Sequence, residues 1–293
     1  MTSRRLLRLA QFALVITLLA YLAINAGMAW MYVHVLTHPG CPSQPSQISD
    51  SPTPEELWLE TPDGLHLRAW YYPSRNGAAI IAMGGMGGAL GQNPPPVDFL
   101  IQKGFGVLQI DTRACARPAA VVTLGAKEAQ DAAAGLSFLA ERPEVKEIGV
   151  FGFSMGASAA LHVAARHQQI AAVVAEGGYF NLGGDFVEPD SRVTVTRRVL
   201  LYSIAAAYWL QSGVNPWEVN PIEDIASISP RPVLLIYGET EAESGRALAQ
   251  FAAAREPKAL WIVPGGAHGS NHATSPGEYE HRVTEFFSAA LSQ

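Results

Sequence analysis

From residue 55 onward, short apolar segments with strand character recur along the chain. Within 56–61 and 65–72, apolar residues occupy every second position, and the intervening Pro62-Asp63-Gly64 is a typical turn, so we expect an antiparallel hairpin. The later segments are more continuously apolar, which is typical of strands buried on both faces of a parallel sheet. These later segments are 78–83, 106–111, 148–153, 170–175, 233–237 and 259–263.

Helical periodicity occupies much of the chain between these segments. Apolar residues recur with helical spacing over 128–141, 157–167, 243–255 and 278–291. Strands that alternate with helices are typical of a doubly wound α/β domain. We therefore predict one α/β domain over residues 55–293, with a mostly parallel sheet of about eight strands.

The interval 177–229 interrupts this alternation, because it contains no clear strand. Its most apolar part, 199–210, is a helix candidate, which three arginines precede and Trp217 follows. We interpret the interval as a cap inserted over the carboxyl edge of the sheet; the alternative is an elaborated crossover helix without a role in binding. The helix has more apolar side chains than one face can bury, so we expect Tyr208 or Trp209 to line an acyl-binding pocket.

The first part of the chain has a different pattern. Residues 9–36 contain no Asp, Glu, Lys or Arg, and they exceed the roughly 20 residues that a bilayer core requires in a helix. Three arginines lie within residues 1–8, and no Lys or Arg then follows until Arg68. Because basic residues favour the cytoplasmic side, we predict a cytoplasmic N-terminus over 1–8, a single transmembrane helix over 9–36, and an extracytoplasmic remainder.

A cleaved signal peptide is the alternative for this segment. The apolar core of a signal peptide is about 7–15 residues long, which is shorter than 9–36, and residues 26–29 make a weak cleavage site. Residues 37–54 then hold several prolines and serines, a composition typical of an extended linker. We expect this linker to tether the folded domain to the membrane.

Composition narrows the class of protein. Of the 293 residues, 48% are hydrophobic and 16% are charged, which excludes a disordered chain and a coiled coil. The formal net charge of −6 offers no basic field, so we expect no nucleic-acid partner. Cys41 and Cys115 are too few for a disulfide-rich scaffold or a four-cysteine zinc site, and the sequence leaves open whether they pair. We expect no metal and no organic cofactor.

A candidate nucleophile follows the strand predicted over 148–153. The sequence Gly152-Phe153-Ser154-Met155-Gly156 has the pattern G-x-S-x-G, and a helix rich in small residues comes next. A nucleophile elbow has this strand–turn–helix setting, with the serine on a tight, strained turn between a strand and a helix. A serine hydroxyl becomes a good nucleophile when a base removes its proton. The sequence therefore predicts Ser154 as a catalytic nucleophile.

The base is expected after a later strand, because the order along the chain in this type of site is serine, acid, histidine. His268 lies in the loop 264–269, directly after the strand predicted over 259–263. The other histidines after the elbow lie in predicted helices or further along the same loop. We therefore predict His268 as the general base.

The acid is less clearly specified, because three glutamates follow the strand predicted over 233–237. Glu241 is our first choice and Glu239 the second, while Asp185 is a more distant third. Glu243 fits the first turn of the next helix, where a carboxylate interacts favourably with the helix dipole.

An oxyanion hole requires backbone N–H groups that point at the developing negative charge. One donor is expected to be the N–H of Met155, directly after the nucleophile. The second is expected from the glycine-rich loop after the strand 78–83, and we favour Gly85 or Met86. The same loop could instead cradle a dinucleotide, but no register of it gives G-x-G-x-x-G, and prolines interrupt the segment where the helix should follow.

The elbow, the loop 238–241 and the loop 264–269 together resemble the α/β-hydrolase superfamily over residues 55–293. Its prolyl-oligopeptidase-like and small membrane-tethered esterase branches are the most similar. The resemblance implies the α/β-hydrolase fold, in which a mostly parallel eight-stranded sheet has helices on both faces and carries an inserted cap.

Two loops depart from the pattern of that superfamily. Many relatives carry His-Gly in the oxyanion loop, where this chain has Met83-Gly84. Many also carry D-x-R-G-x-G after the fourth strand, where this chain has Ala114 and Ala116 in place of the glycines. The second departure concerns local turn geometry more than catalysis.

These observations predict a membrane-anchored serine hydrolase that cleaves a carboxylic ester or thioester through an acyl-enzyme intermediate. Its expected partners are a small-molecule acyl substrate and the membrane. One alternative is a serine peptidase of the prolyl-oligopeptidase-like type. Another is a non-catalytic, membrane-tethered binding protein on a hydrolase fold, which an active-site serine probe would fail to label.

Overall fold

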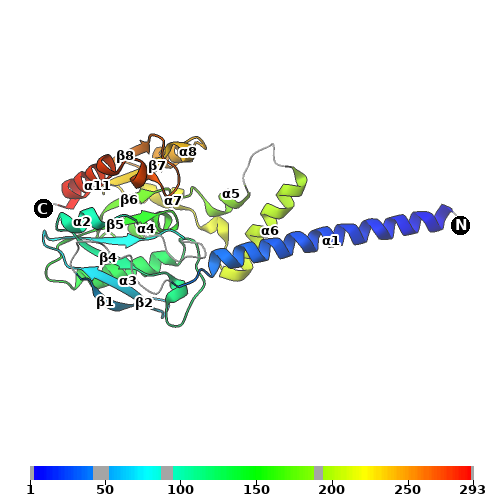
Figure 1. The fold of residues 1–293 in the computed structure, drawn as a ribbon, viewed down its shortest axis with the longest axis horizontal. Coiled ribbons are helices and arrows are strands. Elements are labelled where there is room, and N and C mark those ends of the chain that lie inside the picture. Colours follow the sequence, from blue (N-terminus) through cyan, green and yellow to red (C-terminus); the bar gives the residue numbers. More distant parts are fainter. Residues whose placement is uncertain (1–2, 42–52, 87–94, 188–193, 292–293) are drawn as a thin grey trace.

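The computed structural model describes residues 3–41, 53–86, 95–187 and 194–291, and every structural statement concerns these parts of the chain. They contain an eight-stranded sheet with the order β1-β2-β4-β3-β5-β6-β7-β8 (Figure 1). β1 (Glu55–Glu60) and β2 (His66–Tyr72) form the predicted hairpin, and β2 also pairs antiparallel with β4 (Gly106–Ile110). The other pairings are parallel and join β4 to β3 (Ala78–Met83), β5 (Glu147–Phe153), β6 (Ile170–Glu176), β7 (Val233–Gly238) and β8 (Lys258–Val263).

Helices cover both faces of this sheet, as predicted. Successive residues of a strand point to opposite faces, so the central strands contribute to two separate apolar clusters. One cluster includes α3 (Glu128–Ala140), α4 (Met155–Arg166) and α9 (Arg246–Ala253). The other includes α2 (Asp98–Gln102) and α11 (Pro276–Leu291). Burial on both faces explains why the central strands are continuously apolar.

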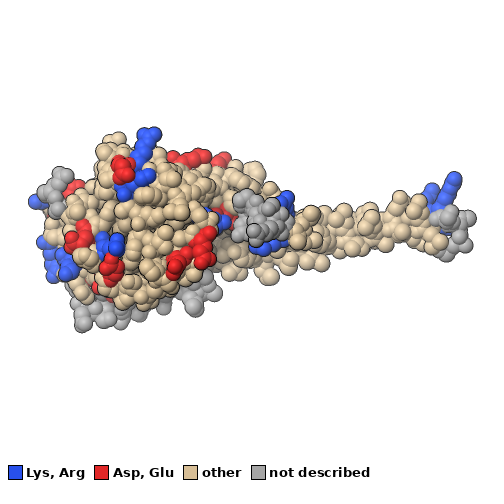
Figure 2. Space-filling view, turned by 90° about the horizontal axis from the view of Figure 1, so that it is seen from above, with Lys and Arg blue, Asp and Glu red and all other residues tan. Residues whose placement is uncertain are grey.

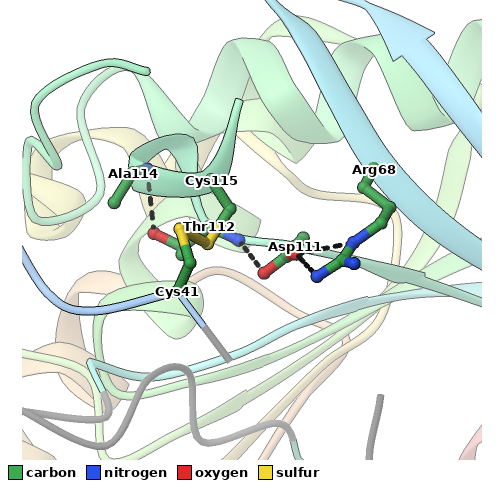
Figure 3. The surroundings of a disulfide bond; sticks show 6 residues. All are labelled: Cys41, Arg68, Asp111, Thr112, Ala114 and Cys115. Carbon is green, nitrogen blue, oxygen red and sulfur yellow. Dashed lines mark hydrogen bonds and ion pairs between the residues drawn. A yellow bond between two sulfur atoms is a disulfide. The ribbon is translucent and has the colours of Figure 1, made fainter. Parts of the chain in front are cut away.

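Residues 111–116, which follow β4 and hold two alanines in place of glycines, fold without left-handed backbone angles. They form a short 3-10 helix over Arg113–Cys115, and Thr112 Oγ1 accepts a hydrogen bond from the Ala114 N–H (Figure 3). Ala116, with a φ of −67°, is extended, and Ala114 is not among the residues with positive φ. The turn therefore tolerates a Cβ at both positions.

Arg113 in this loop is buried between two carboxylates. Its Nε lies 2.9 Å from both carboxylate oxygens of Asp131 in α3, and a terminal nitrogen lies 2.8 Å from both oxygens of Asp63 in the β1–β2 turn. Burial raises the pKa of Asp131, and the charge of Arg113 opposes that rise. These two ion pairs join the hairpin, the loop and α3.

A long helix projects from the domain (Figures 1 and 2). This helix, α1 (Ser3–Thr37), contains the whole predicted transmembrane segment 9–36. It is long and apolar enough to cross a membrane over Arg4–Thr37, and 11% of its most apolar window is buried. Figure 2 shows that the projecting part lacks charged side chains along its length and carries basic ones at its far end.

The other end of α1 is fixed to the domain. Thr37 is buried, and its carbonyl accepts a hydrogen bond from the Val122 N–H at 2.9 Å. Cys41, just beyond the helix, forms a disulfide with Cys115 (Figure 3). The first residues of the predicted linker 37–54 are therefore bonded to the domain. Residues 42–52 of this linker lie outside the described residues.

The described part of the predicted cap, 177–229, contains helices and turns and no strand. Its main helix, α6 (Val195–Ser212), starts at the Thr194 N-cap, ends at Gly213 with a φ of +70°, and packs beside α1 (Figure 1). The shorter elements are α5 (Leu182–Val187), η3 (Pro216–Glu218), α7 (Pro221–Asp224) and η4 (Ile225–Ser227).

The prediction that Tyr208 lines an acyl pocket is wrong. The Tyr208 side chain has no exposed surface, and its hydroxyl donates a hydrogen bond to the Thr123 carbonyl at 2.6 Å. Tyr208 therefore holds α6 against the domain, whereas the neighbouring Trp209 is 56% exposed.

Arg113→Met should lower the free energy of unfolding by about 3–5 kcal/mol, because it leaves the buried Asp131 carboxylate without its cation. Urea unfolding of the full chain in detergent measures this change. Arg282→Met is the matched control, since Arg282 and Glu278 are both about half exposed and such pairs contribute roughly 1 kcal/mol or less. Equal losses in the two variants would contradict the assignment of a structural role to Arg113.

Candidate active site

The turn between β5 and α4 holds Ser154 in an unusual backbone conformation. Its φ is +54° and its ψ is −115°, and such a conformation costs a non-glycine residue about 1–3 kcal/mol. The Ser154 N–H donates a hydrogen bond to the Glu176 carbonyl at 2.7 Å. The turn therefore has the geometry expected of a nucleophile elbow.

The two glycines of G-x-S-x-G are required by close backbone packing. A Cβ at Gly152 would lie 2.1 Å from the carbonyl oxygen of Gly156, and a Cβ at Gly156 would lie 2.2 Å from the carbonyl oxygen of Met83. Any side chain at either position would push α4 away from β3 and β5. The sequence pattern thus reflects the packing of the strands against the start of the helix.

His268 connects the ends of three strands. It lies in the loop after β8, and its Nε2 lies 3.0 Å from Ser154 Oγ, while its Nδ1 lies 2.7 Å from Glu241 Oε1. Glu241 belongs to α8 (Glu239–Ala242), the short helix directly after β7, and its Oε2 accepts the N–H of Gly238 at 2.9 Å. The structure therefore brings the predicted nucleophile, base and first-choice acid into one hydrogen-bonded chain.

The other two acid candidates are engaged elsewhere. Glu239 Oε2 accepts a hydrogen bond from the Gly265 N–H at 2.7 Å, so it supports the loop that carries His268. Asp185 lies 3.1 Å from Arg246 in an ion pair.

Electrostatics favour a proton on His268. The hydrogen bond that His268 donates to Glu241 raises the pKa of His268 above its ordinary value, burial opposes this, and the charges of Glu241 and Glu176 add to the rise. An imidazolium formed at this position is therefore stabilised by the neighbouring carboxylates.

Backbone of the β3 loop lies directly against the nucleophile turn. A Cβ at Gly85 would come within 2.6 Å of the Phe153 ring and 3.0 Å of Ser154 Cβ, so only glycine fits there. Met86 packs against an apolar cluster that also contains Met155. Gly85 and Met155 thus lie beside Ser154, and Met86 packs against the cluster that contains Met155, while residues 87–94 of this loop lie outside the described residues.

The end of β6 contributes two residues that the sequence analysis missed. Gly177 has a φ of +60°, and a Cβ there would lie 3.0 Å from His268 Nδ1. The neighbouring Glu176 carboxylate is buried, and it accepts hydrogen bonds from Asn271 Nδ2 at 2.9 Å and from the Tyr279 hydroxyl. Burial raises the pKa of Glu176. In the sequence, the one feature that could have indicated Glu176 is a carboxylate directly after the apolar strand predicted over 170–175.

Asn271 extends this contact to the histidine loop. It belongs to α10 (Asn271–Thr274), a short helix that starts just after His268. Glu176 therefore links the nucleophile turn, through its carbonyl, to the histidine loop, through its side chain. Among the described residues, no group of three or more His, Cys, Asp or Glu side chains could hold a metal ion.

Comparisons with known proteins agree with this fold. The family model for the C-terminal domain of BAAT and acyl-CoA thioester hydrolases matches residues 133–197, which include the β5–α4 turn. YfhR of Escherichia coli strain K12 is 25% identical over 256 residues, which are 81% of this chain and 82% of YfhR. Rv2307c of Mycobacterium tuberculosis strain H37Rv is 30% identical over 234 residues, which are 76% of this chain and 75% of that protein.

Solved structures share the fold at lower identity. The Pyrococcus furiosus esterase Pf2001 superposes with a TM-score of 0.64 at 22% identity and covers 87% of this chain and 98% of its own. The Pyrococcus horikoshii acylaminoacyl peptidase superposes with a TM-score of 0.61 at 19% identity over 83% of this chain and 42% of its own. With this sheet order, this nucleophile turn and these relatives, the chain belongs to the α/β-hydrolase superfamily.

Proposed function

We propose that this protein is a membrane-anchored serine hydrolase that cleaves a carboxylic ester or a thioester. The observation that carries the proposal is the hydrogen-bonded chain from Ser154 Oγ through His268 to Glu241. A serine next to a base that a carboxylate orients is the arrangement that activates a weak hydroxyl nucleophile. The match to acyl-CoA thioester hydrolases and the fold shared with an esterase support an acyl ester or thioester as the substrate class.

In the first half of the proposed reaction, Ser154 Oγ attacks the acyl carbonyl carbon while His268 Nε2 takes the hydroxyl proton. The negative oxygen of the tetrahedral intermediate accepts hydrogen bonds from the N–H of Met155 and from the N–H of Gly85 or Met86. The bond to the leaving group then breaks, and the imidazolium of His268 returns the proton to the departing alkoxide or thiolate. The acyl group remains on Ser154 as an ester.

In the second half, water replaces the leaving group. His268 removes a proton from the water, whose oxygen attacks the acyl-enzyme carbonyl, and the carboxylic acid leaves as Ser154 regains its proton. Throughout, Glu241 accepts the Nδ1–H of His268, which fixes the tautomer that presents a free Nε2 to the serine and stabilises the imidazolium.

We also propose that α1 spans the membrane, with the arginines of residues 1–8 in the cytoplasm and the domain on the other side. The length and apolar character of α1 support the span, and the position of the arginines supports its orientation. The Cys41–Cys115 disulfide supports an oxidising, extracytoplasmic environment for the domain.

Ser154→Ala should remove almost all turnover of p-nitrophenyl esters, by about a thousandfold or more, because the acyl-enzyme cannot form. The purified full chain in detergent is assayed, and a fluorophosphonate probe should label the wild type and not the variant. Ser137→Ala is the control, since Ser137 lies on the exposed side of α3 and should keep full activity and labelling. Activity of Ser154→Ala above about a tenth of wild type would refute the covalent mechanism.

Glu241→Gln should lower kcat/KM by about a hundredfold or more, because glutamine neither fixes the required tautomer nor stabilises the imidazolium. Glu239→Gln, which alters only the support of the neighbouring loop, should change kcat/KM by no more than a few-fold. Steady-state kinetics of the two variants compare these carboxylates directly. A larger loss in Glu239→Gln would assign the role of the acid to Glu239 instead of Glu241.

The pH profile of kcat/KM should fall on the acid side with a midpoint above the ordinary histidine pKa of about 6.5. Only neutral His268 can accept the serine proton, and a raised pKa keeps the inactive imidazolium populated to higher pH. In Glu241→Gln, the residual activity should show this midpoint at lower pH, since the carboxylate that raises the pKa is gone. An unchanged midpoint would show that Glu241 does not control the protonation of His268.

A further inference from the structure

The exposed face of α6 is unusually apolar. Seven large hydrophobic side chains that follow residue 53 are exposed in the described chain, and four of them lie on this one helix. These four are Val195, Tyr202, Trp209 and Leu210. Val195 and Leu210 are 78% and 76% exposed, so the ends of the helix offer apolar surface that the domain does not cover.

This surface continues directly onto α1. The Tyr21 hydroxyl donates a hydrogen bond to the Thr196 carbonyl at 3.0 Å, and Gln211 Nε2 donates one to the Trp30 carbonyl at 2.9 Å. The start of α6 therefore lies level with Tyr21, and its end lies level with Trp30. Figure 1 shows the two helices side by side where α1 leaves the domain.

The position of α6 along α1 can be compared with the thickness of a bilayer. A hydrocarbon core of about 30 Å corresponds to roughly 20 helical residues, so a span that starts at Leu9, after the arginines of residues 1–8, ends near Met28. Tyr21, and with it the first turn of α6, then lies about 10 Å below the outer boundary, and Trp30 lies near that boundary. Amphipathic helices at membrane surfaces are buried about 5–10 Å deep, which fits α6.

Side chains at this level suit the boundary between headgroups and acyl chains. Trp30 and Trp209 are both exposed there, and tryptophan is enriched at membrane interfaces. Arg198 lies in the first turn of α6, where a long basic side chain can extend toward lipid phosphates while its stem stays in the apolar region.

The nucleophile turn is connected to this helix pair by apolar packing. One cluster contains Ala29 and Val33 of α1, Ala207 of α6, and Met155, which directly follows Ser154. Met86, a candidate oxyanion-hole residue, packs against the same cluster. Side chains in contact therefore connect α1 and α6 to the nucleophile turn.

We infer that α6 is embedded in the outer leaflet beside α1, and that the substrate is an acyl ester of a membrane lipid that reaches Ser154 from the bilayer. The substrate class rests on the proposed hydrolase function, whereas the embedding of α6 does not. An acyl carbonyl in a bilayer lies at the headgroup boundary, which is the level at which α1 enters the domain. With α6 at this level, a lipid could reach Ser154 without leaving the bilayer for water.

The embedding is tested with the full chain in vesicles of phosphatidylcholine and phosphatidylglycerol. Both native cysteines are in a disulfide, so Val195→Cys, which lies level with Tyr21, introduces the one free thiol, to which an environment-sensitive fluorophore is attached. Lipids with a spin label on the acyl chain should quench this fluorophore. Leu248→Cys on α9, with a parent side chain 57% exposed, is the control and should stay unquenched.

The route of the substrate is tested with Val195→Glu/Leu210→Glu and the control Leu248→Glu. The double variant should hydrolyse a fluorogenic long-chain acyl glycerol in the vesicles at least about tenfold more slowly than wild type, because carboxylates are disfavoured below the headgroups. Hydrolysis of p-nitrophenyl acetate from water should stay within about twofold, since both side chains lie outside the catalytic chain. Leu248→Glu should match wild type on both substrates.

Three outcomes would overturn the inference. The Val195 fluorophore could remain unquenched, the double variant could match wild type on the vesicle substrate, or the shift of the fluorophore emission to that of an apolar environment could appear only at high protein-to-lipid ratio, which would show that a second copy covers α6. Wild-type protein that hydrolyses neither substrate and is not labelled at Ser154 would refute the proposed function instead. In that case the quenching result would still decide whether α6 is embedded.

Discussion

Close approach of α4 to β3 and β5 leaves no room for a side chain at Gly152 or Gly156, and the rest of the candidate site is arranged around this contact. The approach forces Ser154 into a conformation that non-glycine residues seldom adopt, with its side chain at the carboxyl edge of the sheet. Every other functional group then comes from the end of another strand of the same sheet. A site built this way depends on the sheet register, because each strand end sets the position of one group.

A second requirement is that the loops after the strands keep their positions. Glu176 fixes two of these loops. Its carbonyl accepts a hydrogen bond from the Ser154 N–H, and its carboxylate accepts one from Asn271, three residues after His268. A buried carboxylate is costly unless its oxygens accept hydrogen bonds, and Tyr279 supplies a further donor. This arrangement couples the nucleophile turn to the histidine loop, although the two are far apart in sequence.

The attachment of α1 changes how the domain relates to a membrane. A flexible linker would let the domain rotate freely, whereas the buried Thr37, the disulfide at Cys41 and the packing of α6 fix its direction relative to α1. With α1 across a bilayer, as we propose, the same face of the domain always meets the lipid. The packing that orients the domain also contains Met155, so orientation and catalytic geometry share one apolar cluster.

Local patterns in the sequence determined the strands, the helices on both faces of the sheet, the long apolar helix, and the loops that carry Ser154, Glu241 and His268. These features depend on periodicity and on turn chemistry within a few residues, which a single sequence displays. Tertiary structure alone decided which glutamate bonds to His268 and that Glu176 links the nucleophile turn to the histidine loop. It also decided that Cys41 bonds to Cys115 and that the Tyr208 side chain is buried in the core. Each of those contacts joins segments distant along the chain, and no local pattern encodes the distance between them.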